Sequence, residues 1–322
     1  MINKNSAQNP YSLDDHNFPC LTSTPVNQQV FPGYPDRLPV PENLVRWQEP
    51  FPGYYPAYYT SSRILAKPGA DSEDISTIDF KTRLTINRKP YLFDKDGYPL
   101  NPNGRTGLRG RGACKFWGPI ESADSMITRY NPENQQIEIL LIEREDNNTL
   151  AFPGGKVDPG ESFTRAALRE LSEEALDFDP QNPPFYLYND DVIFEGISSD
   201  PRNTDNAWYE SRTYHHHLLF SRSKELTIRA GSDANFAAWY PASDQLFKKM
   251  FAGHGEIARF GLYLMHQITS HAIDRETNQA RQAIHALLGP HSDKILPIFE
   301  NGGGKRYARR IEISSEHHYS GI

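Results

Sequence analysis

Gly155 to Asp177 reads GKVDPGESFTRAALRELSEEALD, and the rest of the chain is best understood from this stretch. It follows a Phe-Pro-Gly turn, and neither proline nor glycine occurs from Glu161 to Asp177, which predicts a helix that begins near Ser162. Leucine and alanine recur along it at helical spacing, so one face of the helix can pack against a core.

Three carboxylates project from one patch of this helix, because Glu170, Glu173 and Glu174 occupy positions i, i+3 and i+4. Negative charges at that spacing repel one another unless a cation neutralises them, and a hard divalent cation with oxygen ligands is suited to do so. The alternative is a solvated acidic face. Arg169 lies beside the cluster and can pair with Glu161, which would pin the preceding loop to the helix and favours the cation site.

The stretch resembles the signature of the Nudix hydrolases, which places a glycine and a glutamate before an Arg-Glu-apolar-x-Glu-Glu motif. The matching positions are Gly155, Glu161, Arg169, Glu170, Leu171, Glu173 and Glu174. Leu176 stands where the family has glycine, and Asp177 where it has an apolar residue; both follow the carboxylates and concern the helix exit. The resemblance implies an α/β protein with a Nudix α/β/α sandwich and a mixed sheet, which hydrolyses a diphosphate linked to another group.

The same resemblance implies Mg²⁺ as the cofactor, with Mn²⁺ as a substitute. The expected metal ligands are the Gly155 carbonyl and the carboxylates of Glu170, Glu173 and Glu174. Glu161 and Arg169 would have a structural role and hold the metal ligands in position without binding the metal themselves. The general base is left open between a signature glutamate and Asp233, which lies in the loop before an expected strand.

Composition limits the classes of partner. The 322 residues carry a net charge of −7, the isoelectric point is about 5.9 and the mean hydropathy is −0.67. This balance gives no general attraction to nucleic acid or to an anionic membrane, so neither is expected as a partner. Two cysteines form no disulfide framework, and the first twenty residues lack the features of a signal or transit peptide. We expect a cytoplasmic monomer, with a mitochondrial location left open.

Changes in composition divide the chain into four expected parts. These are a proline- and aromatic-rich arm (residues 1–62), a smaller β-rich N-terminal domain that adds substrate affinity (63–125), the Nudix domain (126–300) and a flexible basic tail (301–322). The arm contains a short repeat, Phe-Pro-Gly-Tyr, at residues 31–34 and 51–54. Within the third part, residues 137–143 and 237–240 read as strands, and residues 275–288 as a helix.

Residues 104–112 interleave four glycines with three arginines. One interpretation is a flexible loop with solvated arginines. The other is an anion cradle, in which backbone amides and guanidinium groups such as those of Arg105 and Arg109 approach a phosphate. The sequence favours neither.

Other segments narrow the resemblance to the animal ADP-ribose pyrophosphatases and to the homologous domain of an ADP-ribose-gated cation channel. They include the run from Asp200 to Trp208, read as DPRNTDNAW, and they cover roughly residues 43–270. The resemblance implies that ADP-ribose binds between two lobes. It assigns Asp200 and Arg202 to the terminal ribose and its phosphate, Phe251 and His254 to the adenine side, and Asp205 to substrate binding in general.

The expected reaction is hydrolysis of ADP-ribose to AMP and ribose 5-phosphate. One alternative is a sensor domain that binds ADP-ribose without cleaving it. Another is a Nudix hydrolase of a different nucleoside diphosphate derivative. The Arg-Glu-x-x-Glu-Glu motif retains Glu170, which favours catalysis over sensing.

Overall fold

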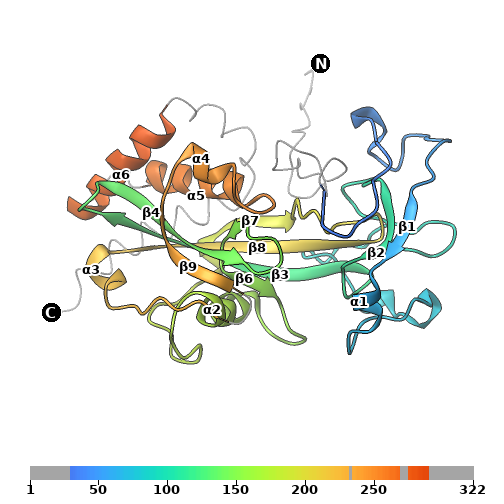
Figure 1. The fold of residues 1–322 in the computed structure, drawn as a ribbon, viewed down its shortest axis with the longest axis horizontal. Helices are drawn as coiled ribbons and strands as arrows, with labels where there is room; N and C mark the ends of the chain where they lie inside the picture. The colour runs from blue at the N-terminus through green and yellow to red at the C-terminus, as the bar shows by residue number, and fades with distance from the viewer. Residues whose placement is uncertain (1–29, 232–233, 269–274, 290–322) are drawn as a thin grey trace, which may run out of the picture.

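The structure is a computed structural model, and it describes residues 30–231, 234–268 and 275–289. Two lobes follow one another along the chain (Figure 1). We call residues 30–117 the N-terminal lobe and residues 118–289 the C-terminal lobe. The expected basic tail and the first half of the expected arm lie outside the described residues.

A seven-stranded mixed sheet forms the centre of the C-terminal lobe. Its strands are β3 (Gly118–Asn131), β4 (Gln136–Arg144), β5 (Leu150–Ala151), β6 (Gly154–Lys156), β7 (Val192–Ile197), β8 (Ala207–Leu218) and β9 (Ala234–Pro241). The order is β5-β4-β3-β8-β7, with β6 paired to β3 and β9 paired to β4. The β3–β8 pair is parallel and the other pairs are antiparallel, so the sheet is mixed, as expected.

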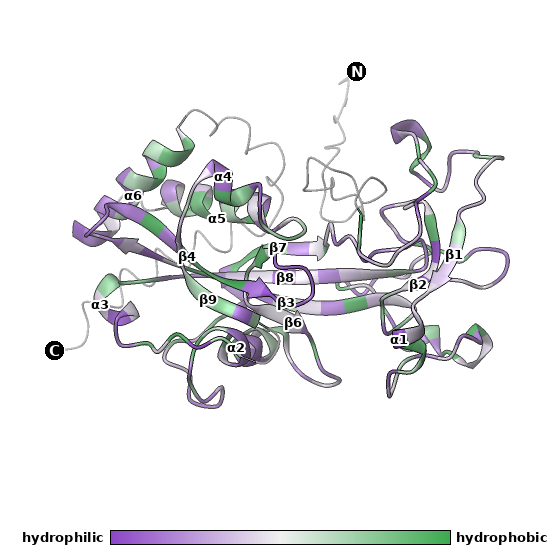
Figure 2. Ribbon diagram, viewed as in Figure 1, coloured by the Kyte–Doolittle hydropathy of each residue, from purple (hydrophilic) through white to green (hydrophobic). Residues whose placement is uncertain are grey.

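Helices cover both faces of this sheet because successive strand residues point to opposite sides. In β4, Ile139 and Leu141 face the core under α4 (Asp244–Phe247), α5 (His254–Ile268) and α6 (Arg275–Leu288). Leu140 and Ile142 face the core under α2 (Phe163–Glu174). A short helix, α3 (Phe220–Ser223), follows β8. Apolar and polar residues alternate around α5 and α6 (Figure 2). The predicted α/β/α sandwich is confirmed.

The N-terminal lobe contains less regular structure than expected. Its elements are η2 (Glu42–Leu44), β1 (Ala57–Thr60), α1 (Ser62–Leu65), η3 (Ile75–Thr77), η4 (Phe80–Thr82) and β2 (Leu108–Gly112). Among the described residues, β1 and β2 are its named strands, and they form a parallel pair. The part of the expected arm that the structure describes therefore shares a sheet with the segment after it.

The two lobes are joined through long strands. β3 begins at Gly118, so the boundary expected between residues 125 and 126 falls inside a single strand. β3 and β8 run side by side from the centre of the sheet toward the N-terminal lobe (Figure 1). No helix in the described ranges has the length and apolar character needed to cross a bilayer.

Candidate active site

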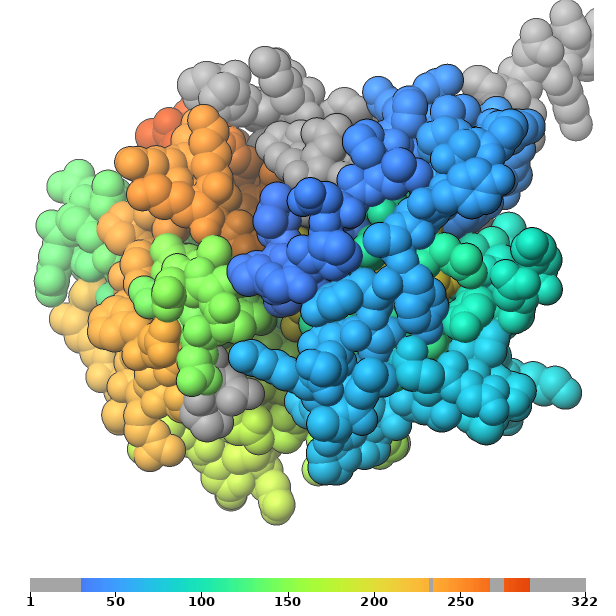
Figure 3. Space-filling view, turned by 45° about the vertical axis from the view of Figure 1, so that its right-hand side comes forward, coloured from blue at the N-terminus to red at the C-terminus, as the bar shows by residue number. Residues whose placement is uncertain are grey.

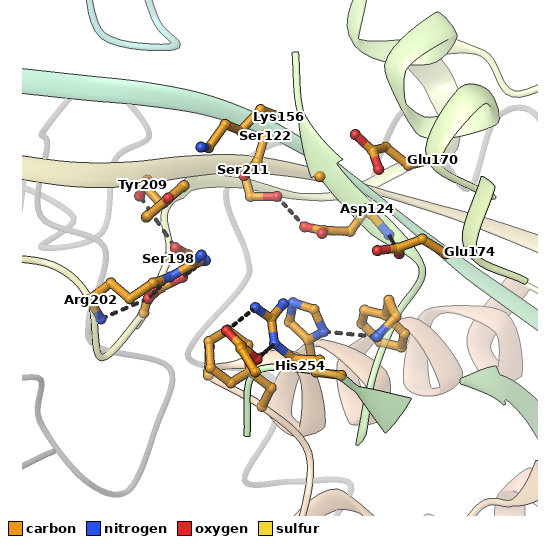
Figure 4. A pocket seen from close by; sticks show the side chains of 18 of the residues that line it. Ser122, Asp124, Lys156, Glu170, Glu174, Ser198, Arg202, Tyr209, Ser211 and His254 are labelled. Carbon is orange, nitrogen blue, oxygen red and sulfur yellow. Dashed lines mark hydrogen bonds and ion pairs between the residues drawn. The ribbon is translucent and has the colours of Figure 1, made fainter. Parts of the chain in front are cut away.

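A cavity of about 660 Å³ lies where β3, β6 and α2 meet loops of the C-terminal lobe and Arg63 of α1 in the N-terminal lobe. The packing of the N-terminal lobe against the C-terminal lobe is visible in Figure 3, and the side chains of the cavity in Figure 4. Of the site residues predicted from the sequence, those that line it are Gly155, Glu170, Glu174, Asp200, Arg202, Phe251 and His254.

Helix α2 holds two of the three signature carboxylates at the cavity. Ser162 caps the helix, its hydroxyl accepting a hydrogen bond from the Arg165 amide at 3.3 Å. The apolar face of α2 is buried, which fixes the direction of the other side chains. Glu170 and Glu174, one turn apart, line the cavity, and Glu174 accepts a hydrogen bond from the Gly154 amide at 2.9 Å.

Glu173, an expected metal ligand, is not among the residues that line the cavity, so its role as a ligand stays a prediction. Its side chain is 53% exposed and lies 3.2 Å from an Arg169 guanidinium nitrogen. Arg169 also binds both oxygens of Glu161 at 3.0 Å, the Lys156 carbonyl at 2.9 Å and Glu170 at 2.8 Å. The contact predicted between Arg169 and Glu161 is therefore present, and it ties the loop to the helix.

The two glycines of the turn leave room for the acids. A Cβ atom on Gly155 would clash with the Glu170 carboxylate, and one on Gly154 would clash with the carboxylate of Asp124. Any larger residue would push these carboxylates away from the backbone that they approach.

Asp124 is a site residue that the sequence reading missed. It lies in the middle of β3, lines the cavity and accepts a short hydrogen bond from the Ser211 hydroxyl. Burial raises its pKa to about 7, with Glu170 and Asp200 adding to the rise. The available signal was a lone carboxylate between Ala123 and Met126 in a run that reads as buried strand.

Asp124, Glu170 and Glu174 form what we call the acidic wall. Burial, together with the charges of Glu170 and Asp124, raises the pKa of Glu174 to about 8. Mutual repulsion in a water-accessible cavity is what a hard divalent cation relieves, so the donor set fits Mg²⁺. Among the described residues, no group of three or more His, Cys, Asp or Glu side chains is placed so that it could hold a metal ion. A bound ion would complete its shell with water or substrate oxygens.

The side of the cavity opposite the acidic wall contains an ion pair (Figure 4). Arg202 donates to the two oxygens of Asp200 at 2.9 and 2.5 Å. Burial tends to raise the pKa of Asp200, but the Arg202 guanidinium outweighs it and holds the pKa below its ordinary value. The guanidinium also stacks 4.1 Å from the centre of the Tyr209 ring. Asp200 and Tyr209 thus fix the orientation of Arg202.

His254 is held as a neutral side chain at the floor of the cavity. Its Nδ1 accepts a hydrogen bond from the Phe152 amide at 3.0 Å, and its ring stacks on Phe152 with centres 4.7 Å apart. Burial and the positive charge of Arg144 lower its pKa to about 3. Because Nδ1 accepts, the proton of the neutral ring is on Nε2, which is then a donor. Arg144 lies 4.2 Å above the Phe251 ring beside it.

Three predicted substrate-binding residues lie elsewhere. Arg105 donates to the carbonyls of Leu44 at 2.7 Å and of Glu49 at 3.0 Å, so its charge is used inside the N-terminal lobe. Arg109 pairs with Asp94 at 3.0 Å. Residues 108–112 form the strand β2, mostly buried, so neither a flexible loop nor an anion cradle describes them.

Asp205, the third, is fully enclosed. It accepts hydrogen bonds from the Thr106 amide at 2.7 Å and from the Tyr54 hydroxyl at 2.6 Å. Its role is to join the lobes. Asp233, the alternative general base, falls outside the described residues.

Two family models match successive parts of the chain. Residues 40–118 match the family model "NUDT9-like, N-terminal domain", and residues 121–260 match the model "NUDIX domain". The chain is 36% identical to nudix hydrolase 6 of Caenorhabditis elegans over 233 residues, which cover 68% of this chain and 87% of the relative.

Two further relatives are similar to the chain over both lobes. It is 33% identical to the mitochondrial ADP-ribose pyrophosphatase of Rattus norvegicus, covering 70% of this chain and 73% of that protein. It is 32% identical to a transient receptor potential cation channel, subfamily M member-like 2, of Nematostella vectensis, covering 69% of this chain but 16% of the channel. The chain therefore belongs to the Nudix hydrolase family, with a NUDT9-like domain in front of its Nudix domain.

Proposed function

We propose that this protein is an ADP-ribose pyrophosphatase that uses Mg²⁺, or Mn²⁺ in its place, to release AMP and ribose 5-phosphate. The observation that carries the proposal is the pairing of an acidic wall with an oriented arginine across one cavity. The rat relative is named for the same activity, which supports the choice of substrate. Its name also includes a mitochondrial location, so that location stays the alternative to the cytoplasm.

The acidic wall and the signature loop would hold the cofactor. Glu170, Glu174 and Asp124 supply carboxylate oxygens, and the Gly155 carbonyl is a further candidate ligand. When bound, Mg²⁺ offsets the diphosphate charge and lowers the pKa of the attacking water. The Arg169–Glu161 pair keeps the loop and helix at a fixed distance, so the oxygens are arranged before substrate arrives.

The remaining side chains orient the substrate. Arg202, fixed by Asp200, would donate to the phosphoryl oxygens on which charge grows during the reaction. The neutral His254 can donate from Nε2 without adding a charge to the adenine side of the cavity. Phe251 offers a ring for stacking, and Arg144 keeps that ring in place.

The alternative of a sensor that binds ADP-ribose without cleaving it finds less support. A sensor has no need of the acidic wall, whereas this chain places Glu170 and Glu174 together at the cavity. Burying a carboxylate is costly unless a charge partner, hydrogen bonds or a metal ion compensate it, and catalysis with a metal supplies such compensation. The wall is therefore a reason to favour hydrolysis.

Product analysis tests the proposal directly. The full chain is incubated with ADP-ribose and Mg²⁺, and nucleotides are separated by chromatography; we expect AMP and ribose 5-phosphate in equal amounts, and neither when the metal is chelated. NADH and a dinucleoside polyphosphate serve as comparison substrates. Survival of ADP-ribose together with binding seen by calorimetry would establish the sensor instead.

A further inference from the structure

Lys156 in β6 lines the cavity, and we call the part of the cavity around its ammonium the cationic end; Arg63 in α1 lines the same cavity. Neighbouring residues of a strand point to opposite sides, so Gly155 faces Glu170 while Lys156 turns away from it. Figure 4 shows the Lys156 ammonium on the side of Tyr209, remote from Glu170. The two lobes thus contribute one cation each to the same cavity.

Positive charge at this end is not compensated. Across the described ranges, neither Lys156 nor Arg63 has a side-chain hydrogen bond or a carboxylate partner. The Lys156 side chain is partly buried and shares the cavity with three arginines, Arg63, Arg144 and Arg202. Asp200, an acid that lines the same cavity, is already paired with Arg202. A partly buried, crowded ammonium is unfavourable unless an anion joins it.

A hydroxyl group also lines the cavity on the side to which the Lys156 ammonium points (Figure 4). Tyr209 lines the cavity and is 4% exposed, and its ring is stacked under Arg202. Within the part of the chain that the structure describes, the Tyr209 hydroxyl has no hydrogen-bond partner. An ammonium, a guanidinium and a rigid phenol that face one space can together bind the oxygens of a phosphate monoester.

ADP-ribose alone does not account for these groups. Its two charged phosphates belong with the acidic wall and Arg202, and its terminal ribose offers hydroxyls, which a cation binds weakly. We propose that the cationic end is a phosphate subsite, so that this cavity takes ADP-ribose bearing an additional phosphate on the terminal ribose. This inference rests on the proposed function, which places the diphosphate between the acidic wall and Arg202. It goes further by proposing that the terminal ribose of the substrate carries a phosphate.

The test compares three substrates with the full chain and Mg²⁺. They are ADP-ribose, ADP-ribose phosphorylated at the 1″ position of the terminal ribose, and ADP-ribose phosphorylated at the 2′ position of the adenosine. We expect the highest kcat/KM for the terminally phosphorylated substrate. The adenosine 2′-phosphate controls for net charge, because it places the extra phosphate at the opposite end.

Variants then test which residues cause the preference for the terminally phosphorylated substrate. Lys156→Met should reduce the ratio of kcat/KM for terminally phosphorylated over plain ADP-ribose by about tenfold or more, because a charged hydrogen bond is lost. Lys156→Arg should retain most of the ratio, and Tyr209→Phe should lower it less than Lys156→Met. Lys81→Met, which removes an exposed lysine outside the cavity, should keep the wild-type ratio.

Binding measured by calorimetry, with metal chelated, separates the two proposals. A ligand preference that is lost in Lys156→Met while no substrate is cleaved would leave the subsite standing and end the proposed function. Hydrolysis of ADP-ribose with a substrate ratio that is the same in wild type and Lys156→Met would overturn the subsite alone. So would an equal fall of kcat/KM for both substrates, since Lys156 would then serve the diphosphate.

Discussion

At the scale of single residues, the structure separates carboxylates that the signature treats alike. Glu173 and Glu174 are neighbours in α2, and a helix turns about 100° between them. Glu174 therefore reaches the cavity and the Gly154 amide, while Glu173 remains half exposed beside Arg169. Helical spacing alone places both on one patch and leaves their roles equal.

This difference predicts unequal effects of equal substitutions. Glu174→Gln should lower kcat for ADP-ribose hydrolysis by about 100-fold or more, because it removes a charge worth several kcal/mol at the site of metal binding. Glu173→Gln should lower it by about tenfold at most. Steady-state kinetics at saturating Mg²⁺ checks this, with thermal melting of both variants as the control for folding. Similar losses from the two would mean that Glu173 enters the cavity during turnover.

At the scale of elements, the site depends on how closely β6 approaches α2. Gly155 has an ordinary backbone conformation, so alanine would fit its dihedral angles, yet its methyl group would displace the Glu170 carboxylate. Gly160, five residues on, has a φ of +81° and open space around it. Glycine is needed at position 155 because the Glu170 side chain leaves no room for a methyl group. Glycine is needed at position 160 because its backbone has a positive φ.

The two alanine substitutions should therefore affect different quantities, one the catalytic efficiency and the other the stability. Gly155→Ala should lower kcat/KM by more than about tenfold, since overpacking by one methyl group costs about 1–3 kcal/mol and falls on Glu170. Gly160→Ala should instead lower the free energy of unfolding by about 1–2 kcal/mol through its strained φ, with kcat/KM close to that of wild type. Kinetics and urea denaturation distinguish them. A fall in kcat/KM for Gly160→Ala as large as that for Gly155→Ala would refute the assignment.

The same scale explains what could be predicted from the sequence. The helix after Ser162, strand β4 and helix α6 follow from periodicity and turn residues, which are local signals. The fate of Arg105 is not local, because the carbonyls that bind it come from residues about sixty positions earlier. Asp124 was missed for a related reason: its relation to Glu170 and Glu174 exists only once β3 and β6 pair.

At the scale of the whole molecule, the N-terminal lobe serves the site through a loop. Its expected arginines do not reach the cavity, but its two Phe-Pro-Gly-Tyr turns hold the segment 200–205 at both ends. The Tyr34 hydroxyl donates to the Arg202 carbonyl at 2.9 Å, and Tyr54 donates to Asp205 at 2.6 Å. Between them, Arg37 donates to the carbonyls of Pro201 and Asn203, both at 2.8 Å. The two copies of the sequence repeat therefore have the same structural role, because the tyrosine of each one hydrogen-bonds to the segment 200–205.

If the lobe positions Arg202 in this way, loosening the turn should weaken substrate binding more than chemistry. Tyr34→Phe removes one buried hydroxyl and leaves the Arg202 carbonyl and the Ala113 amide without that partner. KM for ADP-ribose should rise about three- to tenfold, the equivalent of about 1 kcal/mol, while kcat changes less than twofold. Tyr55→Phe, at a tyrosine that is 84% exposed, is the matched control and should change neither constant. A lower melting temperature for Tyr34→Phe with KM unchanged would show that the turn only stabilises the lobe, since a loosened Arg202 must appear in KM.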